Sequence, residues 1–240
     1  SLHGKKQSYI PVVLQNELTY FLTQGNVSQI CQELYRAGLG QAHIWIGENL
    51  SYDNEKITNG NVSEFTEYIS EGLTVLAVYN EHSRAFSITG IADSSFIRSD
   101  VPMTKREIRA SVVSRMAVSK NSCVYDIGAG TGSVTVELAL HALYGTVYAV
   151  ERTEEGCSLI AKNAEKFGLN NIEIIQGNAA AVIDSLPVPD KVFIGGSGGE
   201  LEYIFSSILK KNPYVHIVVT AVTLETLNNT ISLMEKNGVN

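Results

Sequence analysis

The chain has 240 residues, of which 44% are hydrophobic and 18% charged, an ordinary globular composition with length for one large domain or two smaller ones. Its net charge of -7 argues against a general nucleic-acid-binding protein, because neutralising phosphates requires a basic surface. We find no apolar run near the roughly 20 residues that span a bilayer and no signal-peptide pattern, so we expect a cytoplasmic protein without a membrane partner.

Cysteine and histidine spacing indicates neither a disulfide framework nor a metal site. The cysteines are odd in number, widely spaced and outside any C-x-x-C pair. The histidines are equally scattered and form no HExxH pattern. These residues are Cys31, Cys123 and Cys157, and His3, His43, His82, His141 and His216. We therefore predict no metal.

Residues 1–90 have the pattern of a small α/β unit. Asn26 is a candidate N-cap for a helix that Gly38 ends. Strand patterns follow at 43–46 and 73–79, with a short strand candidate at 56–58 and a second helix at 62–69 between them. Polar residues 80–100 then lose apolar periodicity, so we place a domain boundary near residue 90.

Residues 91–240 have the pattern of a doubly wound, mostly parallel α/β sheet of the Rossmann-like class. A helix is predicted from Thr104 to about Ala117. Apolar strands are predicted at 123–127, 146–150, 172–175, 192–194 and 215–219, with helical segments between them. Near-continuous apolar strands that alternate with helices indicate a parallel sheet covered on both faces.

A glycine-rich loop follows the first strand of this sheet, at the start of a helix. Glycine allows the tight turn and a close approach of the backbone to a ligand, while the helix N-terminus presents free N–H groups. Taken alone, such a loop is as often only a tight turn. Its residues, with the preceding acid, are Asp126, Ile127, Gly128, Ala129, Gly130, Thr131 and Gly132.

Glu151 ends the next strand, 19 residues past Gly132, where a carboxylate can accept hydrogen bonds from both ribose hydroxyls. Alone it would be read as a solvated acid, but the loop and the acid together predict a nucleoside cofactor. A phosphate-binding P-loop would need a Lys followed by Ser or Thr after the glycines, and none is present. The dinucleotide fingerprint would need glycine at Ser133, which disfavours NAD.

The G-x-G-x-G pattern behind Asp126 resembles the S-adenosylmethionine loop of class I methyltransferases, over about residues 96–240. The resemblance implies that Asp126 faces the aminoacyl end of the cofactor and that Asn178 and Ala179 lie beside its adenine. Asp126 as a loop cap and Asn178 as a helix N-cap are the structural alternatives.

A narrower resemblance rests on four motifs: Phe96-Ile97-Arg98, Val101-Pro102-Met103-Thr104-Lys105, the glycine loop, and Phe193-Ile194 followed by Gly195, Gly196, Ser197, Gly198 and Gly199. Together they resemble the decarboxylating C15-methyltransferase domain of precorrin-6Y methyltransferases, a family of cobalamin biosynthesis. The resemblance implies methylation of a precorrin or cobalt-precorrin at carbon 15, with decarboxylation of the adjacent ring acetate. It makes Thr104 a cofactor contact and residues 195–199 substrate contacts.

Precorrins carry many carboxylates, and residues 98–120 hold six basic side chains against two acidic ones. Lys105 and Arg109 are four apart, so we expect them to share a helix face and bind substrate, with Arg98 a further candidate. A solvated basic helix face is the alternative. Thr104 with Glu107 also satisfies a capping box that would start this helix.

The first ninety residues show a second resemblance, to the carboxyl-terminal half of a tetrapyrrole methylase domain, which in bifunctional enzymes methylates carbon 5. It rests on Ser1-Leu2-His3-Gly4, the helix ending at Gly38, Gly47-Glu48-Asn49-Leu50 and Glu55-Lys56-Ile57. With half of that domain present we assign no site there. The resemblance also implies further strands after the helix containing Leu224, so we expect a second domain truncated at its carboxyl end, and we expect a homo-oligomer.

We assign no catalytic residue, because methyl transfer to carbon needs mainly in-line positioning and exclusion of water. An S-adenosylmethionine-dependent methyltransferase of RNA or another small molecule is the alternative function. An NAD-linked domain and a non-catalytic module that senses the nucleoside are the remaining ones.

Overall fold

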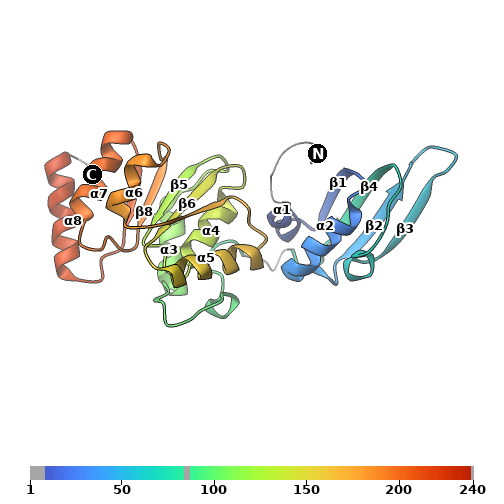
Figure 1. Ribbon diagram of the computed structural model, residues 1–240, viewed down its shortest axis with the longest axis horizontal. Coiled ribbons are helices and arrows are strands. Elements are labelled where there is room, and N and C mark those ends of the chain that lie inside the picture. Colours follow the sequence, from blue (N-terminus) through green and yellow to red (C-terminus); the bar gives the residue numbers. More distant parts are fainter. Residues whose placement is uncertain (1–8, 84–86, 239–240) are drawn as a thin grey trace. The chain divides into compact units, whose positions relative to one another are not determined.

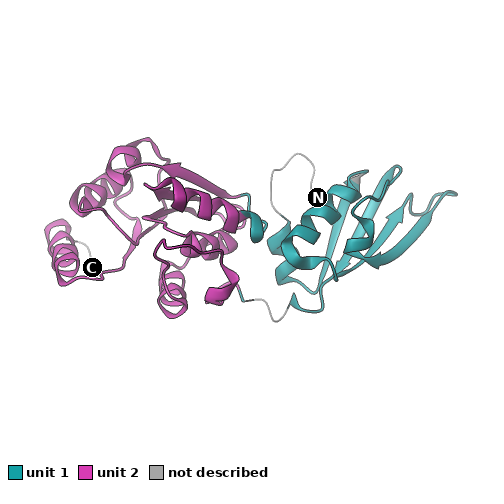
Figure 2. Ribbon diagram, turned by 60° about the horizontal axis from the view of Figure 1, so that its bottom comes forward, with its two compact units in different colours: residues 1–87, 165–170 teal, residues 88–164, 171–240 magenta. Residues whose placement is uncertain are grey.

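The computed structural model describes residues 9–83 and 87–238 (Figure 1). The chain forms two compact units, residues 1–87 with 165–170 and residues 88–164 with 171–240 (Figure 2). The Ser1-Leu2-His3-Gly4 motif lies outside the described residues. Within the described ranges, no helix is long and apolar enough to cross a membrane.

The first unit is a four-stranded antiparallel sheet in the order β1-β4-β2-β3. Side chains alternate between the two faces of a strand, and the inward rows of these strands pack with α2 around a core that includes Phe21, Ile44 and Leu76. The elements are α1 (Ile10–Gln15), β1 (Leu18–Gln24), α2 (Val27–Leu34), β2 (His43–Glu48), β3 (Lys56–Asn61), the short 3₁₀ turn Val62–Phe65 and β4 (Leu73–Tyr79).

The three strands predicted in this unit are confirmed, as is Asn26 at the N-cap position of α2. Two elements were missed, α1 and β1, and β1 pairs with β4 along its whole length. The helix predicted over 62–69 is wrong beyond Phe65, because a capping box between Asn61 and Glu64 supports a single 3₁₀ turn.

The outward rows of this sheet are apolar. Leu18, Tyr20 and Leu22 of β1 are exposed, as is Trp45 of β2. Register places Tyr20 and Trp45 on either side of Ala77 in β4. The sheet face opposite α2 therefore carries large apolar side chains open to solvent.

The second unit is a five-stranded parallel sheet in the order β7-β6-β5-β8-β9, which confirms the predicted fold and all five predicted strands. Figure 1 shows α3, α4 and α5 on one side of the sheet and α6, α7 and α8 on the other. The elements are α3 (Arg106–Met116), β5 (Cys123–Ile127), α4 (Ser133–His141), β6 (Thr146–Glu151), α5 (Glu154–Lys166), β7 (Ile172–Gln176), α6 (Ala179–Val182), β8 (Lys191–Ile194), α7 (Leu201–Lys211), β9 (His216–Val219) and α8 (Leu224–Asn237).

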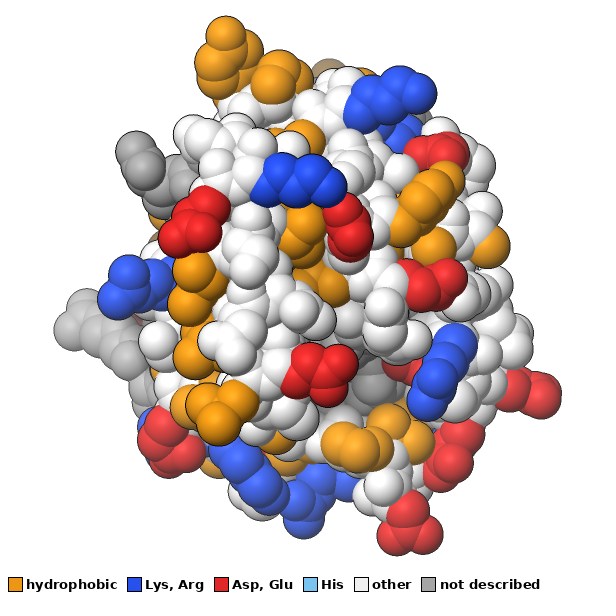
Figure 3. Space-filling view, turned by 90° about the vertical axis from the view of Figure 1, so that its left-hand side faces the viewer, with side chains coloured by type: hydrophobic (Ala, Val, Ile, Leu, Met, Phe, Trp, Pro, Cys, Tyr) orange, Lys and Arg blue, Asp and Glu red, His pale blue; other side chains and the backbone are white. Residues whose placement is uncertain are grey.

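Strand order reverses beside β5, because the chain runs outward through β6 and β7 and then returns to add β8 and β9 on the other side. Ligands of doubly wound sheets bind at the carboxyl ends of the strands next to such a reversal. The glycine-rich loop after β5 and residues 195–199 after β8 meet there. On the side of the unit that carries α8, acidic, basic and apolar side chains are intermingled (Figure 3).

Candidate functional site

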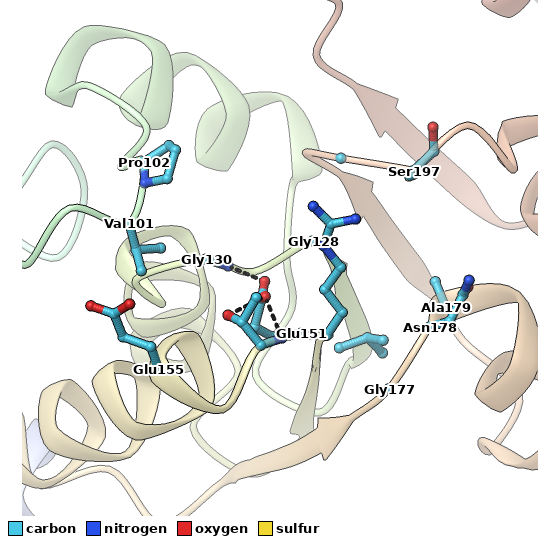
Figure 4. A pocket seen from close by; sticks show the side chains of 15 residues that line it. Val101, Pro102, Gly128, Gly130, Glu151, Glu155, Gly177, Asn178, Ala179 and Ser197 are labelled. Carbon is cyan, nitrogen blue, oxygen red and sulfur yellow. Dashed lines mark hydrogen bonds between the residues drawn. The ribbon is translucent and has the colours of Figure 1, made fainter.

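A cavity of about 420 Å³ opens at the carboxyl ends of β5, β6, β7 and β8, within the usual size of small-molecule pockets (Figure 4). Its walls come from the loops after these strands and from the segment before α3. The lining residues are Val101, Pro102, Gly128, Gly130, Val150, Glu151, Arg152, Thr153, Glu155, Gly177, Asn178, Ala179, Gly196, Ser197 and Gly198.

The loop after β5 requires glycine for both conformation and space. Gly128, Gly130 and Gly132 have φ angles of 74°, 56° and 76°, which L side chains rarely adopt. A Cβ on Gly128 would lie 2.6 Å from the carbonyl oxygen of Gly196. The loops after β5 and β8 therefore touch through their backbones, and this contact forms the floor of the cavity.

Glu151 is held from three directions at the centre of the cavity (Figure 4). One carboxylate oxygen accepts from the N–H and the hydroxyl of Thr153, at 2.9 and 2.8 Å, and the other accepts from Gly130 N–H at 3.0 Å. Burial alone would raise the pKa of Glu151, but hydrogen bonds from Thr153, Gly130 and the Arg152 backbone outweigh it and the pKa lies below its ordinary value. The carboxylate lines the cavity, so a ligand hydroxyl there can also donate to it.

Asp126 is completely buried behind the loop and does not line the cavity. Its Oδ2 accepts from the Thr135 hydroxyl at 2.6 Å, while Oδ1 has no hydrogen-bond partner among the described residues. Burial raises the pKa of this carboxyl from 3.8 to about 7. A buried oxygen without a partner costs free energy, so a ligand group that reached it would be bound favourably.

Asn178 and Ala179 line the cavity past the carboxyl end of β7 (Figure 4). The Asn178 side chain accepts from Ala180 N–H at 2.9 Å, which confirms Asn178 as the N-cap of α6. That bond uses the side-chain oxygen and leaves the amide NH₂ for other partners. Capping and a contact with a base edge are therefore compatible.

A family profile described as a precorrin methyltransferase domain matches residues 95–240. The chain belongs to this family. The probable cobalt-precorrin-6B C(15)-methyltransferase (decarboxylating) of Saccharolobus solfataricus is 43% identical over 160 residues, 64% of this chain and 79% of the relative. The precorrin-6Y C(5,15)-methyltransferase [decarboxylating] of a Sinorhizobium species is 29% identical over 199 residues, 82% of this chain and 48% of the relative.

Solved structures of related proteins agree with this membership. The precorrin-6Y C5,15-methyltransferase of Geobacter metallireducens matches with a TM-score of 0.61 and 35% identity, over 64% of this chain and 82% of its own. The precorrin 8W decarboxylase of Methanobacterium thermoautotrophicum matches with a TM-score of 0.59 and 35% identity, over 62% of this chain and 82% of its own. The precorrin methyltransferase domain thus has the Rossmann-like fold of class I methyltransferases.

The prediction that Arg109 binds substrate is wrong. Its guanidinium is completely buried, with Nε 2.5 Å from Glu137 Oε1 and Nη1 3.1 Å from Asp93. It also donates to the backbone oxygens of Thr104 and Ile91. Each of these partners belongs to the second unit itself, so Arg109 cannot meet a substrate carboxylate.

The predicted pairing of Lys105 with Arg109 on one helix face is also wrong, because Lys105 lies outside the helix. The helix begins at Arg106, so Lys105 is the N-cap residue, with extended backbone and an exposed side chain. The Thr104 capping box is likewise wrong, because the Thr104 carbonyl accepts from Arg109 at 2.7 Å and the helix starts two residues later. Arg98 and Lys105 are exposed, and their substrate contacts stay predictions.

Some of the remaining predicted site residues line the cavity and others do not. Gly196, Ser197 and Gly198 line it. The residues that do not are Ala129, Thr131, Gly132, Gly195 and Gly199, together with Thr104. Gly132 still has a positive φ, and a Cβ there would lie 2.9 Å from Ile160 of α5, so its glycine serves the turn.

Several lining residues were missed by the sequence reasoning. Val101 and Pro102 stood inside a quoted motif, but only the folded chain shows them facing the loop after β5 (Figure 4). Three more lining residues, Arg152, Thr153 and Glu155, follow Glu151 closely. Their position just after a strand end is the signal that could have identified them. The described residues contain no group of three or more His, Cys, Asp or Glu side chains that could hold a metal ion.

Proposed function

We propose that this protein binds S-adenosylmethionine, methylates carbon 15 of a precorrin or cobalt-precorrin, and decarboxylates the adjacent ring acetate in cobalamin biosynthesis. The observation that carries the proposal is Glu151, fixed by the glycine loop inside a cavity of a precorrin methyltransferase domain. A relative that shares 43% identity bears a name with this activity.

The residues present fit this cofactor, which supplies an electrophilic methyl group on a sulfonium. The Glu151 carboxylate would accept a hydrogen bond from a ribose hydroxyl, and Asn178 with Ala179 would border the adenine. Gly128 and Gly130 let the backbone approach without a side chain. Asp126 does not line the cavity, so its contact with the aminoacyl end of the cofactor stays a prediction.

On the acceptor side, Gly196, Ser197 and Gly198 would lie against the flat macrocycle, because their backbone presents little side-chain bulk. Arg152 lines the cavity as an exposed cation, and with Lys105 and Arg98 it could meet ring carboxylates. The protein orients the acceptor carbon and excludes water. Loss of the acetate carboxyl as carbon dioxide leaves an electron pair that the conjugated ring accepts, and a proton replaces the carboxyl.

Calorimetric titration with S-adenosylhomocysteine, run beside NAD, tests the cofactor. We expect saturable binding of the homocysteine compound alone, and a preference for NAD would refute the proposal. An anaerobic assay with the precorrin then tests the reaction by mass spectrometry. We expect a product that has gained a methyl group and lost carbon dioxide, whereas methylation of RNA with no change in the precorrin would favour the alternative function.

For the first unit, we infer that it is the carboxyl-terminal half of a C5-methylating tetrapyrrole methylase domain. The support is the alignment with the Sinorhizobium C(5,15)-methyltransferase, which covers 82% of this chain and so extends ahead of residue 95. This chain spans about half of that relative. The homo-oligomer and the cytoplasmic location stay predictions, and light scattering tests the first.

A further inference from the structure

The strap, which we define as residues 90–105 ahead of α3, forms one wall of the proposed cofactor cavity. Val101 and Pro102 of the strap line the cavity opposite Glu151 (Figure 4). A Cβ on Gly130 would lie 3.0 Å from the Pro102 carbonyl oxygen, so the strap rests against the glycine loop. The width of the cavity at this point depends on how strap and loop are held together.

The beginning of the strap is anchored by residues that do not line the cavity. Glu137 of α4 is completely buried and accepts from the N–H groups of Gly90 and Ile91 at 2.8 and 3.0 Å. Arg109 joins this cluster through Glu137 and packs over the Phe96 ring, 4.6 Å from its centroid. These contacts fix the strap up to Phe96, and Arg109 also donates to Thr104 C=O at 2.7 Å, which fixes its end. The segment around Ile97 is left to other partners.

Asn163 of α5 holds this middle segment of the strap through Ile97. Its Oδ1 accepts from Ile97 N–H at 2.8 Å, and its Nδ2 donates to Ile97 C=O at 3.0 Å and to Thr131 C=O at 2.9 Å. Ile97 belongs to the strap and Thr131 to the glycine loop. The side chain is completely buried and does not line the cavity, so its amide connects the two walls without reaching the ligand.

We propose that Asn163 is a positioning residue for the methyl donor. It ties strap to glycine loop, and thereby sets the spacing between Pro102 and Gly130 and the place of Val101 beside the cofactor. A neutral amide suits this task, because it donates and accepts at once, whereas a hydroxyl or carboxylate would leave a buried backbone group unpaired. The inference rests on the proposed function, since it concerns the same cavity.

Asn163→Ser tests the proposal against Asn171→Ser as a matched control. Asn171 also bonds backbone through its amide, donating to Ala139 and Ala142 C=O at 3.0 and 2.8 Å, away from the cavity. We expect N163S to weaken S-adenosylhomocysteine binding about tenfold, since small misplacements in binding walls are costly, and N171S to stay within about twofold. Hydrogen exchange should quicken at Ile97 and Val101 in N163S alone, with β5 and β8 protected as in the wild type.

The outcomes separate this inference from the proposed function. A wild-type protein that does not bind S-adenosylhomocysteine refutes the function. A wild type that binds, with N163S binding equally well or with both serine variants weakened equally, overturns the positioning role and leaves the function standing. If N163S does not fold, N163D replaces it, because it keeps the acceptor for Ile97 N–H and loses both donations. The same comparison then applies.

Discussion

Replacing Glu151 with glutamine keeps the shape of the side chain and removes its charge at the centre of the cavity. Thr153 donates two hydrogen bonds and Gly130 one to the carboxylate, whose side toward the cavity would accept a ribose hydroxyl. A hydrogen bond to a charged group contributes about 1.5–3 kcal/mol, so E151Q should weaken S-adenosylhomocysteine binding about 10- to 150-fold. Calorimetry measures this loss directly.

Two controls make the result specific. Glu155→Gln removes a charge from an exposed acid on the same cavity wall, and we expect little change in affinity. Ligands lacking the 2′- or the 3′-hydroxyl identify the contact, because the ligand without the bonded hydroxyl should bind wild type and E151Q almost equally. If E151Q weakens the binding of both deoxy ligands by the same factor as it weakens the binding of S-adenosylhomocysteine, Glu151 does not bind the ribose and the assignment fails.

Three further predictions concern stability, each measured by urea unfolding. Burial raises the pKa of Asp126 to about 7, so between about pH 4 and pH 7 the folded state holds a proton that the unfolded chain has lost. The free energy of unfolding should therefore fall as pH rises through this window and level off above it. The D126N variant has no such proton and should not follow this trend. Gly128→Ala should destabilise the fold by about 1–3 kcal/mol, because Gly128 has a positive φ and a Cβ there would overlap Gly196. Gly196→Ala should cost little, because its Cβ would meet nothing within 4 Å. Equal losses of stability would contradict the role of the loop contact. Arg109→Met should cost about 3–5 kcal/mol, because it leaves the charge of Glu137 buried without its cation, and a neutral result would show that the ion pair is dispensable.

Local sequence pattern was sufficient to predict the fold of the second unit, because each signal is confined to a few neighbouring residues. A run of apolar residues predicts a buried strand, and all five such runs became strands of one parallel sheet. Glycines after the first strand and an acid after the second could be placed at the same sheet edge, since parallel strands end together. Gly128, Gly130 and Glu151 accordingly line one cavity.

In the first unit the same reasoning missed β1, although residues 18–23 hold only aromatic, β-branched and leucine side chains between Glu17 and Gly25. Both faces of this strand carry apolar groups, so it lacks the polar and apolar alternation that identifies a half-buried strand. Its antiparallel pairing with β4, more than fifty residues along the chain in the register Leu18 to Tyr79, decided its structure. This pairing joins segments that meet only after folding, so the local sequence could not reveal it.

By itself the sequence determined the fold class, the glycine loop, the strand-end acid and the family resemblance. Only the tertiary structure decided which way the charged and amide side chains point. Arg109 looked available to substrate on a basic helix, yet its partner Glu137 lies 28 residues further on and encloses it in the core. Asn163 carries no motif at all, and its role emerges because folding brings Ile97 and Thr131 to the two ends of one amide. Spacing along a chain fixes which groups are near in sequence, whereas burial and hydrogen-bond pairing depend on segments that meet only after folding.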